Sequence, residues 1–157
     1  MRISDKTFLA IIGMHDTLTA EQISTLKQEG DSSRLPLQSV AIKQKLITNE
    51  ELTKLFSEYA SIPYVEITPE DIPPEALEKI PEHIARQYNS IVFSIDEDET
   101  LNLAMEDPDD IEAINFLQKR IGTNIKIHVC THDNILAALD AYRTDVDKEL
   151  GEVISGQ

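Results

Sequence analysis

The sequence predicts a mixed α and β protein (α+β or α/β), in which a small helical bundle precedes a small α/β subdomain whose sheet contains a hairpin. Helical periodicity fills the first sixty residues, a proline-rich stretch follows, and strand-like alternation comes after it. The 157 residues suffice for one compact domain or two small ones. We expect a helical part over residues 1–61, a connector over 62–81, an α/β part over 82–144, and a flexible tail or linker over 145–157.

Two helix starts in the first part share one pattern. Thr17–Ile23 and Leu46–Leu52 each contain an apolar residue, a Thr suited to cap a helix, and an acidic or amide residue three positions later. We interpret them as two related helical units that pack together, with Gly30 stopping the first helix. The second start leads into a stripe with helical spacing that predicts a buried face: Leu52, Leu55, Phe56 and Tyr59.

The connector is predicted from its prolines, because proline fixes its own φ and favours extended backbone before it. Tyr64–Ile67 reads as a short extended segment, Pro73 and Pro74 as the opening of a short helix, and Pro81 as the start of the next. Little apolar periodicity precedes Ala76. We therefore expect a semi-rigid, movable joint between the two halves.

The α/β part combines a hairpin, two helices and a further strand. Ser90–Ile95 and Thr100–Met105 flank the turn Asp96–Glu99, a hairpin pattern. A helix starting at Asp109 or Asp110 is expected to bury Ile111, Ile114 and Leu117 and to end at Gly122. The last strand has Ile125, Ile127 and Val129 on one face, and Thr131 or Asp133 caps a final helix with Ile135, Leu136, Leu139 and Tyr142.

The net charge of −15 restricts the partners. Such a surface repels nucleic-acid phosphates and anionic lipid, so it suits a basic protein partner or serves only solubility. Nothing resembles a signal peptide or an apolar stretch of about 18 residues that could insert in a membrane. With a single cysteine, these features lead us to expect a cytoplasmic protein.

We expect no catalytic, metal or cofactor site. None of the five glycines precedes a lysine, so the phosphate-binding loop of nucleotide hydrolases is missing. His128, Cys130 and His132 are close enough in sequence to test as metal ligands or as a nucleophile with a base. The strand alternation favours a structural role, with Ile127 and Val129 on the buried face. The acidic run at Met105–Asp110 suits helix capping.

The order of these features resembles the N-terminal domain of type II secretion and type IV pilus assembly ATPases. The resemblance runs from about Leu18 to Tyr142 and rests on "SIPYVEI", "IPPEALEKIPEHIARQY", "LNLAMEDPDDIEAI" and "ILAALDAY". It implies a docking or regulatory module, not an enzyme. Its implied partners are the ATPase domain of the same motor and the cytoplasmic domain of an inner-membrane platform protein, which would hold the chain at the membrane. The docking residues are not identified by the sequence.

Some members of that family bind cyclic di-GMP through two tandem motifs of the form Arg-Leu-Gly-x-x-Leu-Val-x-x-Gly-x-Ile. In the second copy here, Leu37 and Ile42 keep apolar positions, Pro36 takes the Arg position, and Gln38 and Lys45 take the Gly positions. Arg34 lies two residues too early. The first copy has Thr7, Leu9 and Asp16 at the corresponding positions. The resemblance thus makes Arg34, Leu37 and Ile42 the candidate ligand residues, and we expect little or no binding.

Overall fold

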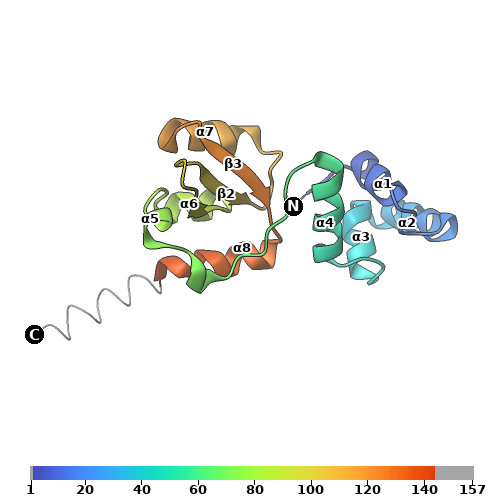
Figure 1. The fold of residues 1–157 in the computed structure, drawn as a ribbon. Coiled ribbons are helices and arrows are strands. Elements are labelled where there is room, and N and C mark those ends of the chain that lie inside the picture. The colour runs from blue at the N-terminus through green and yellow to red at the C-terminus, as the bar shows by residue number, and fades with distance from the viewer. Residues whose placement is uncertain (1, 144–157) are drawn as a thin grey trace, which may run out of the picture. The chain divides into compact units, whose positions relative to one another are not determined.

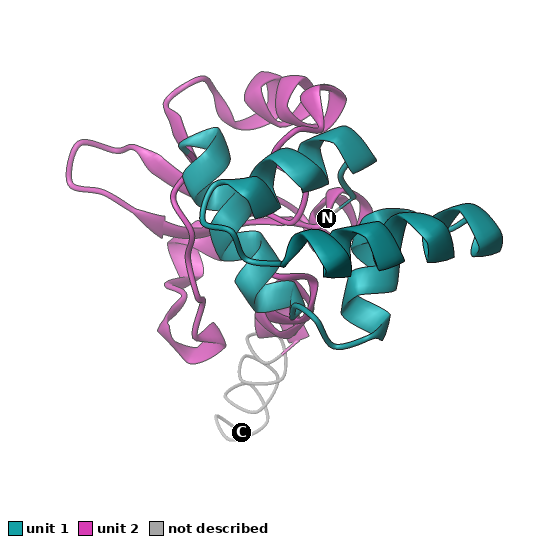
Figure 2. Ribbon diagram, turned by 90° about the vertical axis from the view of Figure 1, so that its right-hand side faces the viewer, with its two compact units in different colours: residues 1–61 teal, residues 62–157 magenta. Residues whose placement is uncertain are grey.

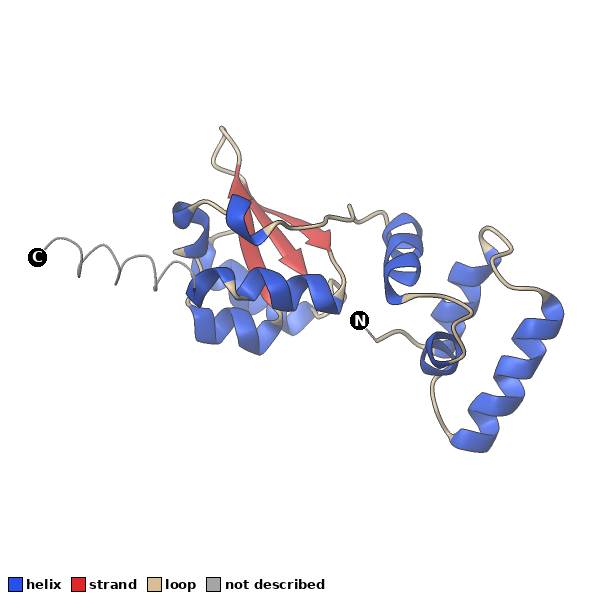
Figure 3. Cartoon of the chain, turned by 90° about the horizontal axis from the view of Figure 1, so that it is seen from below, coloured by secondary structure: helices blue, strands red, loops and turns tan. Residues whose placement is uncertain are grey.

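The computed structural model describes residues 2–143, which divide between two compact units, Met1–Ser61 and Ile62–Gln157 (Figure 2). The predicted tail over residues 145–157 lies outside the described residues. The first unit is helical, and the described part of the second contains three strands and five helices (Figure 3). The predicted fold class, a helical bundle followed by an α/β part with a hairpin, is confirmed.

Unit 1 consists of four helices, α1 (Asp5–Gly13), α2 (Ala20–Ser33), α3 (Leu37–Lys43) and α4 (Asn49–Ala60) (Figure 1). Its core is aliphatic with two phenylalanines, and its largest fully buried side chains are Phe8, Ile11, Ile12, Leu26, Ile47, Leu52 and Phe56. Burial of such side chains is worth about 1.5–3 kcal/mol each, so this core supplies most of the unit's stability.

The two related segments of unit 1 have matching local structure. Thr19 and Thr48 are both N-caps, and each hydroxyl accepts a hydrogen bond from the backbone N–H three residues on, at 3.1 Å. Asp16 and Lys45 both have left-handed backbone, with φ of 48° and 60°. The next residue in each segment donates its backbone N–H to the carbonyl five positions earlier. Thr17 donates to Ile12 at 3.2 Å, and Leu46 donates to Ala41 at 3.0 Å. The correspondence therefore includes the helix before each turn.

Two expectations for unit 1 are wrong. Gly30 does not stop α2, which continues to Ser33 and ends at Arg34 in left-handed backbone with φ of 57°. Gly30 instead permits a close approach, because a Cβ there would lie 3.2 Å from Leu37 Cδ2 and 3.3 Å from the Leu35 carbonyl oxygen. Tyr59, the last member of the predicted stripe, is exposed, whereas Thr53 is buried.

Unit 2 contains a three-stranded sheet in the order β1-β2-β3, made of β1 (Ser90–Ile95), β2 (Leu101–Met105) and β3 (Ile125–Val129). β1 and β2 form the predicted antiparallel hairpin, with a bulge between Val92 and Ser94. β2 and β3 are parallel. The helices are η1 (Pro69–Asp71), α5 (Pro74–Leu77), α6 (Glu82–Tyr88), α7 (Ile111–Ile121) and α8 (His132–Leu139).

Helices cover both faces of this sheet. In Figure 1, α7 lies above the strands and α8 below them. All five residues of β2 are buried, although alternate residues of a strand point to opposite faces. The caps are as expected, with Asp110 starting α7, Gly122 ending it at φ of 97°, and Thr131 starting α8. Ile111 is an exception, because it is exposed whereas Ala113 and Leu117 of α7 are buried. Leu136 of α8 is also exposed.

The predicted connector over residues 62–81 is instead part of unit 2. The backbone N–H of Val129 donates to the Pro63 carbonyl at 2.8 Å, and that of Val65 donates to the Val129 carbonyl at 3.0 Å, which extends the sheet beyond β3. Farther along, Ile67, Ile72, Ala76, Leu77 and Ile80 belong to the same buried cluster as the strands. The prolines open helices here, as expected, but the apolar residues between them anchor the segment to the sheet.

Asn134 fixes this segment to α8. The Ile67 N–H donates to Asn134 Oδ1 at 2.8 Å, and Asn134 Nδ2 donates to the Ile67 carbonyl at 2.9 Å. Asn134→Ala leaves both backbone groups without this partner, so we expect the free energy of unfolding to fall by about 1–3 kcal/mol. Urea denaturation followed by circular dichroism measures the loss, and hydrogen exchange should accelerate at residues 65–67.

The matched control is Asn115→Ala, because Asn115 is an exposed asparagine of α7. Its effect should stay within about 0.5 kcal/mol. Equal effects of the two substitutions would show that residues 62–81 are not held by Asn134.

Candidate functional site

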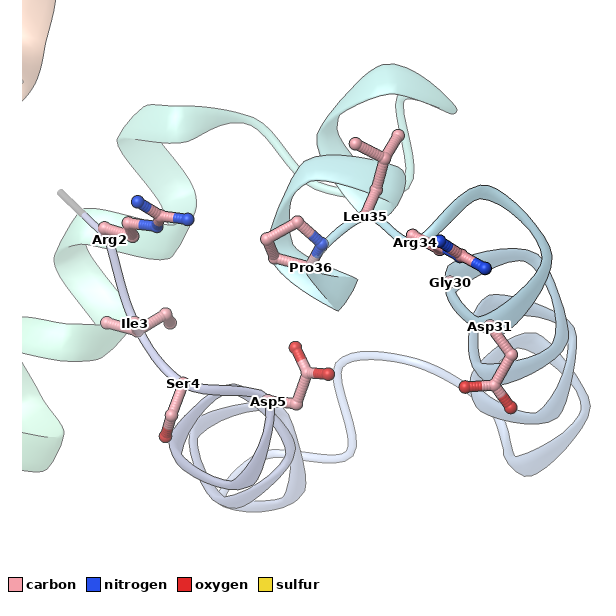
Figure 4. A pocket seen from close by; sticks show the side chains of 9 residues that line it. All are labelled: Arg2, Ile3, Ser4, Asp5, Gly30, Asp31, Arg34, Leu35 and Pro36. Carbon is pink, nitrogen blue, oxygen red and sulfur yellow. The ribbon is translucent and has the colours of Figure 1, made fainter.

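A hollow of about 540 Å³ opens on unit 1 where α1 begins, α2 ends and α3 begins (Figure 4). Its lining is mainly polar and includes two arginines and two aspartates, and the full set is Arg2, Ile3, Ser4, Asp5, Gly30, Asp31, Arg34, Leu35 and Pro36. Four charged side chains around one concave surface are suited to polar recognition. This hollow is therefore the candidate ligand site of unit 1.

Two hydrogen bonds join the start of α1 and the residues just before it to the beginning of α3. Asp5 Oδ1 accepts from the Leu37 backbone N–H at 3.0 Å, and Gln38 Oε1 accepts from the Ile3 N–H at 3.0 Å. The Asp5 carboxylate thus accepts a hydrogen bond from the backbone at the start of α3. A second carboxylate, Asp31, also lines the hollow, so an incoming anion meets negative charge within the site.

The structure does not gather the three predicted ligand residues around this hollow. Arg34 is exposed and lines it. Leu37 is buried, and Ile42 is half-buried and outside the lining. Arg2, Ser4 and Asp31 also line the hollow, but the sequence did not predict them, because they lie outside both copies of the cyclic di-GMP motif. Only the meeting of α1 with the end of α2 brings them to one place.

In each motif copy, the residue at the second glycine position has a backbone conformation that favours glycine. Asp16 and Lys45 both have positive φ, the left-handed region that most residues avoid. The first glycine position of the second copy differs, because Gln38 there is buried and bonded to Ile3. The two second-glycine positions therefore have a backbone that favours glycine, whereas the first-glycine position of the second copy holds a buried side chain.

The negative charge is concentrated in unit 2. Residues 1–61 contain seven basic and eight acidic residues, a net charge of −1, and residues 62–157 contain seven basic and 21 acidic residues, a net charge of −14. The net charge of the whole chain therefore says little about the hollow. Repulsion of an anion there comes from Asp5 and Asp31, and attraction comes from Arg2 and Arg34.

A profile of the MshEN domain matches residues 60–148, more than half of the chain. The chain belongs to the MshEN domain family. A sequence relative is the type IV pilus assembly ATPase PilB of Myxococcus xanthus (strain DK1622), 21% identical over 138 residues. The alignment covers 87% of this MshEN chain but 24% of PilB, so the chain spans about a quarter of that relative's length.

Two solved structures share the fold. A structure of MshE with cdg has a TM-score of 0.71 at 18% identity and covers 86% of this chain and 97% of that chain. The N-terminal domain of XpsE has a TM-score of 0.60 at 19% identity, covering 90% and 97%. The resemblance to N-terminal domains of secretion and pilus ATPases is therefore confirmed for the family and the fold.

The residues His128, Cys130 and His132 of this MshEN chain do not form a common site. The Cys130 side chain is fully buried in the core, although the alternation that places Ile127 and Val129 on the buried face would put Cys130 on the opposite face with His128. His132 Nδ1 lies 2.9 Å from Glu106 Oε2, and the His128 ring packs edge-on against Phe93. Burial lowers the pKa of His128. Within residues 2–143, no group of three or more His, Cys, Asp or Glu side chains could hold a metal ion.

Among the helices of residues 2–143, none combines the length and the apolar character that a membrane span needs.

The Cys130 thiol should be unreactive in the folded protein. Burial raises its pKa to about 12, and the nearby Glu106 carboxylate adds to the rise, so the thiolate is scarce at pH 8. We expect native protein to react with a disulfide reagent at least about 100 times more slowly than protein in 6 M guanidinium, since both access and ionisation are lost. The measurement is thiol release at pH 8. Equal rates in both solutions would contradict the burial of Cys130.

Proposed function

We propose that the chain is a non-catalytic docking domain of a type II secretion or type IV pilus assembly motor. It binds the cytoplasmic domain of an inner-membrane platform protein and connects that protein to the ATPase domain of the same motor. The observation that carries this proposal is the MshEN match, supported by the alignment to a quarter of a pilus assembly ATPase. The site of action is then cytoplasmic, at the inner membrane through the protein partner.

Two features support a non-catalytic role. The sequence has no glycine followed by lysine, so it lacks the loop that holds nucleotide phosphates in such hydrolases. Its cysteine is buried with a raised pKa, which is the reverse of what a nucleophile needs. Chemistry in such a machine would come from the ATPase domain, and this chain would contribute binding.

The charge distribution supports a protein partner for unit 2. A net charge of −14 on residues 62–157 attracts basic surfaces and repels nucleic acid and anionic lipid. Complementary charge accelerates encounter and makes it sensitive to salt.

Binding of cyclic di-GMP is the second candidate function. It is favoured by the similar fold of MshE, which was solved with cdg, by the retained left-handed turns at Asp16 and Lys45, and by Arg34 in the hollow. The carboxylates of Asp5 and Asp31 and the buried side chain of Gln38 act against it. We place docking first because this chain lacks the Arg and Gly residues of the cyclic di-GMP motif.

The docking proposal predicts that the chain binds the purified cytoplasmic domain of the platform protein from the same organism. The expected dissociation constant is about 0.1–10 μM, about −10 to −7 kcal/mol, a range suited to a working machine. Calorimetry in 50 mM and 500 mM salt should show weaker binding at high salt. Absence of binding at about 100 μM would overturn the proposal.

For cyclic di-GMP we predict a dissociation constant above about 100 μM, less favourable than about −5.5 kcal/mol. The ligand is a dianion, and two carboxylates line the hollow that would receive it. Calorimetry at low salt is the fairest measurement, because electrostatic attraction to Arg34 is then strongest.

The informative variants are Arg34→Ala and, as its control, Lys27→Ala, which removes a cation outside the lining of the hollow. Micromolar binding that weakens with Arg34→Ala and not with Lys27→Ala would replace docking by ligand sensing as the leading function.

A further inference from the structure

The outer face of α7 exposes two large apolar side chains. Ile111 is 68% exposed and Phe116 is 38% exposed. Residues four apart are neighbours on a helix, so Ile111 lies beside Asn115 and Glu112 lies beside Phe116. All four are exposed, and we call them the α7 face. The opposite side of the helix is anchored in the core by Ala113 and Leu117, which fixes the orientation of this face.

Packing within unit 2 accounts in part for Phe116, through Tyr88, but it leaves the Ile111 side chain mostly in solvent. Ile111 and Phe116 are five positions apart, about 140° around the helix, so they lie at the two edges of its exposed side with Glu112 and Asn115 between them. A segment that crosses this side of α7 meets both. Phe116 is also held in place, because its ring lies 5.2 Å from that of Tyr88 at the end of α6. Aromatic side chains that are already positioned lose little entropy on binding and often contribute most of the affinity.

The charges along α7 indicate which partner fits. Its amino end is strongly acidic, with Asp107, Asp109, Asp110 and Glu112 within six positions, and the sequence has no lysine or arginine between Arg86 and Lys119. The carboxyl end carries Lys119 and Arg120. A partner must therefore present aliphatic side chains to Ile111 and Phe116 and basic side chains to the acidic end.

We propose that the α7 face binds an amphipathic segment of the platform partner, with its lysines and arginines over the amino end of α7. This inference rests on the docking function proposed above and names the surface and the chemistry of the partner. Apolar contact at Ile111 and Phe116 supplies affinity, and the charge gradient along α7 sets the direction in which the segment lies.

The first test compares two exposed aliphatic residues. Ile111→Ser should weaken binding of the platform protein's cytoplasmic domain by about tenfold or more, measured by calorimetry. Leu136→Ser is the control, because Leu136 is 42% exposed on α8 and is likewise near acidic residues, Asp133 and Asp140. It should change the dissociation constant by less than about twofold. Circular dichroism verifies that both variants fold.

The second test compares two equal changes of charge. The test pair, Asp109→Asn with Glu112→Gln, removes one carboxylate from a loop turn and one from the first turn of α7. The control pair, Glu97→Gln with Glu75→Gln, removes one carboxylate from a loop turn and one from the first turn of α5. Only the first pair should slow association by about threefold to tenfold at 50 mM salt. Lys119→Gln, at the basic end, should not weaken binding.

The outcomes separate this inference from the docking function. If the wild-type chain binds and Ile111→Ser matches Leu136→Ser, the α7 face is not the docking surface, although docking stands. Equal slowing by the two charge pairs would show that the acidic residues act only through the overall charge of the chain. It would overturn the proposed orientation of the segment. If the wild-type chain does not bind the platform domain, both the docking function and this inference fail.

Discussion

The central strand β2 is the constraint on which the second unit depends. It pairs antiparallel with β1 and parallel with β3, and all five of its residues are buried. A strand buried on both faces needs a cover on both, and a parallel neighbour needs a crossover, which α7 provides. The position of α7 therefore follows from β2, and so does the outward direction of Ile111 and Phe116. Residues 63–65 add to the far side of β3, which brings the proline-rich segment into the same core.

The first unit depends on a different device, two helix–turn–helix segments of similar local structure. Both turns use a left-handed residue and a threonine cap, although the residues in the left-handed positions are Asp16 and Lys45. Left-handed backbone costs about 1 kcal/mol or more for such residues, so tertiary packing must hold it. Beside the hollow, Asp5 and Gln38 accept hydrogen bonds from the backbone N–H groups of Leu37 and Ile3, which connects the start of α1 to the start of α3.

The two units differ in what they offer to a partner. Unit 1 has almost no net charge and a polar hollow whose opposing charges balance. Unit 2 is strongly acidic and carries the α7 face, on which Ile111 and Phe116 are exposed beside acidic residues. A small anionic ligand would be sought in the first, and a basic protein segment in the second. Under the proposed functions, each kind of recognition would use a separate part of the chain.

Local sequence patterns determined most of the element boundaries. The caps at Thr19, Thr48, Asp110 and Thr131 and the stop at Gly122 were predictable, because capping is chemistry between residues three or four positions apart. The hairpin was predictable for a similar reason, since its alternation and its turn lie within sixteen residues. The family, too, followed from the order of short motifs.

The tertiary structure decided what local patterns leave open. Ile111 and Tyr59 fit a helical stripe but are exposed, because the neighbouring elements, not the stripe, determine how far a core extends. Cys130 follows β3, where continued strand alternation predicts exposure, yet its side chain enters the core. Prolines mark residues 62–81 as irregular, but only the distant partners Val129 and Asn134 hold them in the second unit. The hollow likewise exists only where the ends of three helices meet, an arrangement of residues some thirty positions apart that depends on packing between helices.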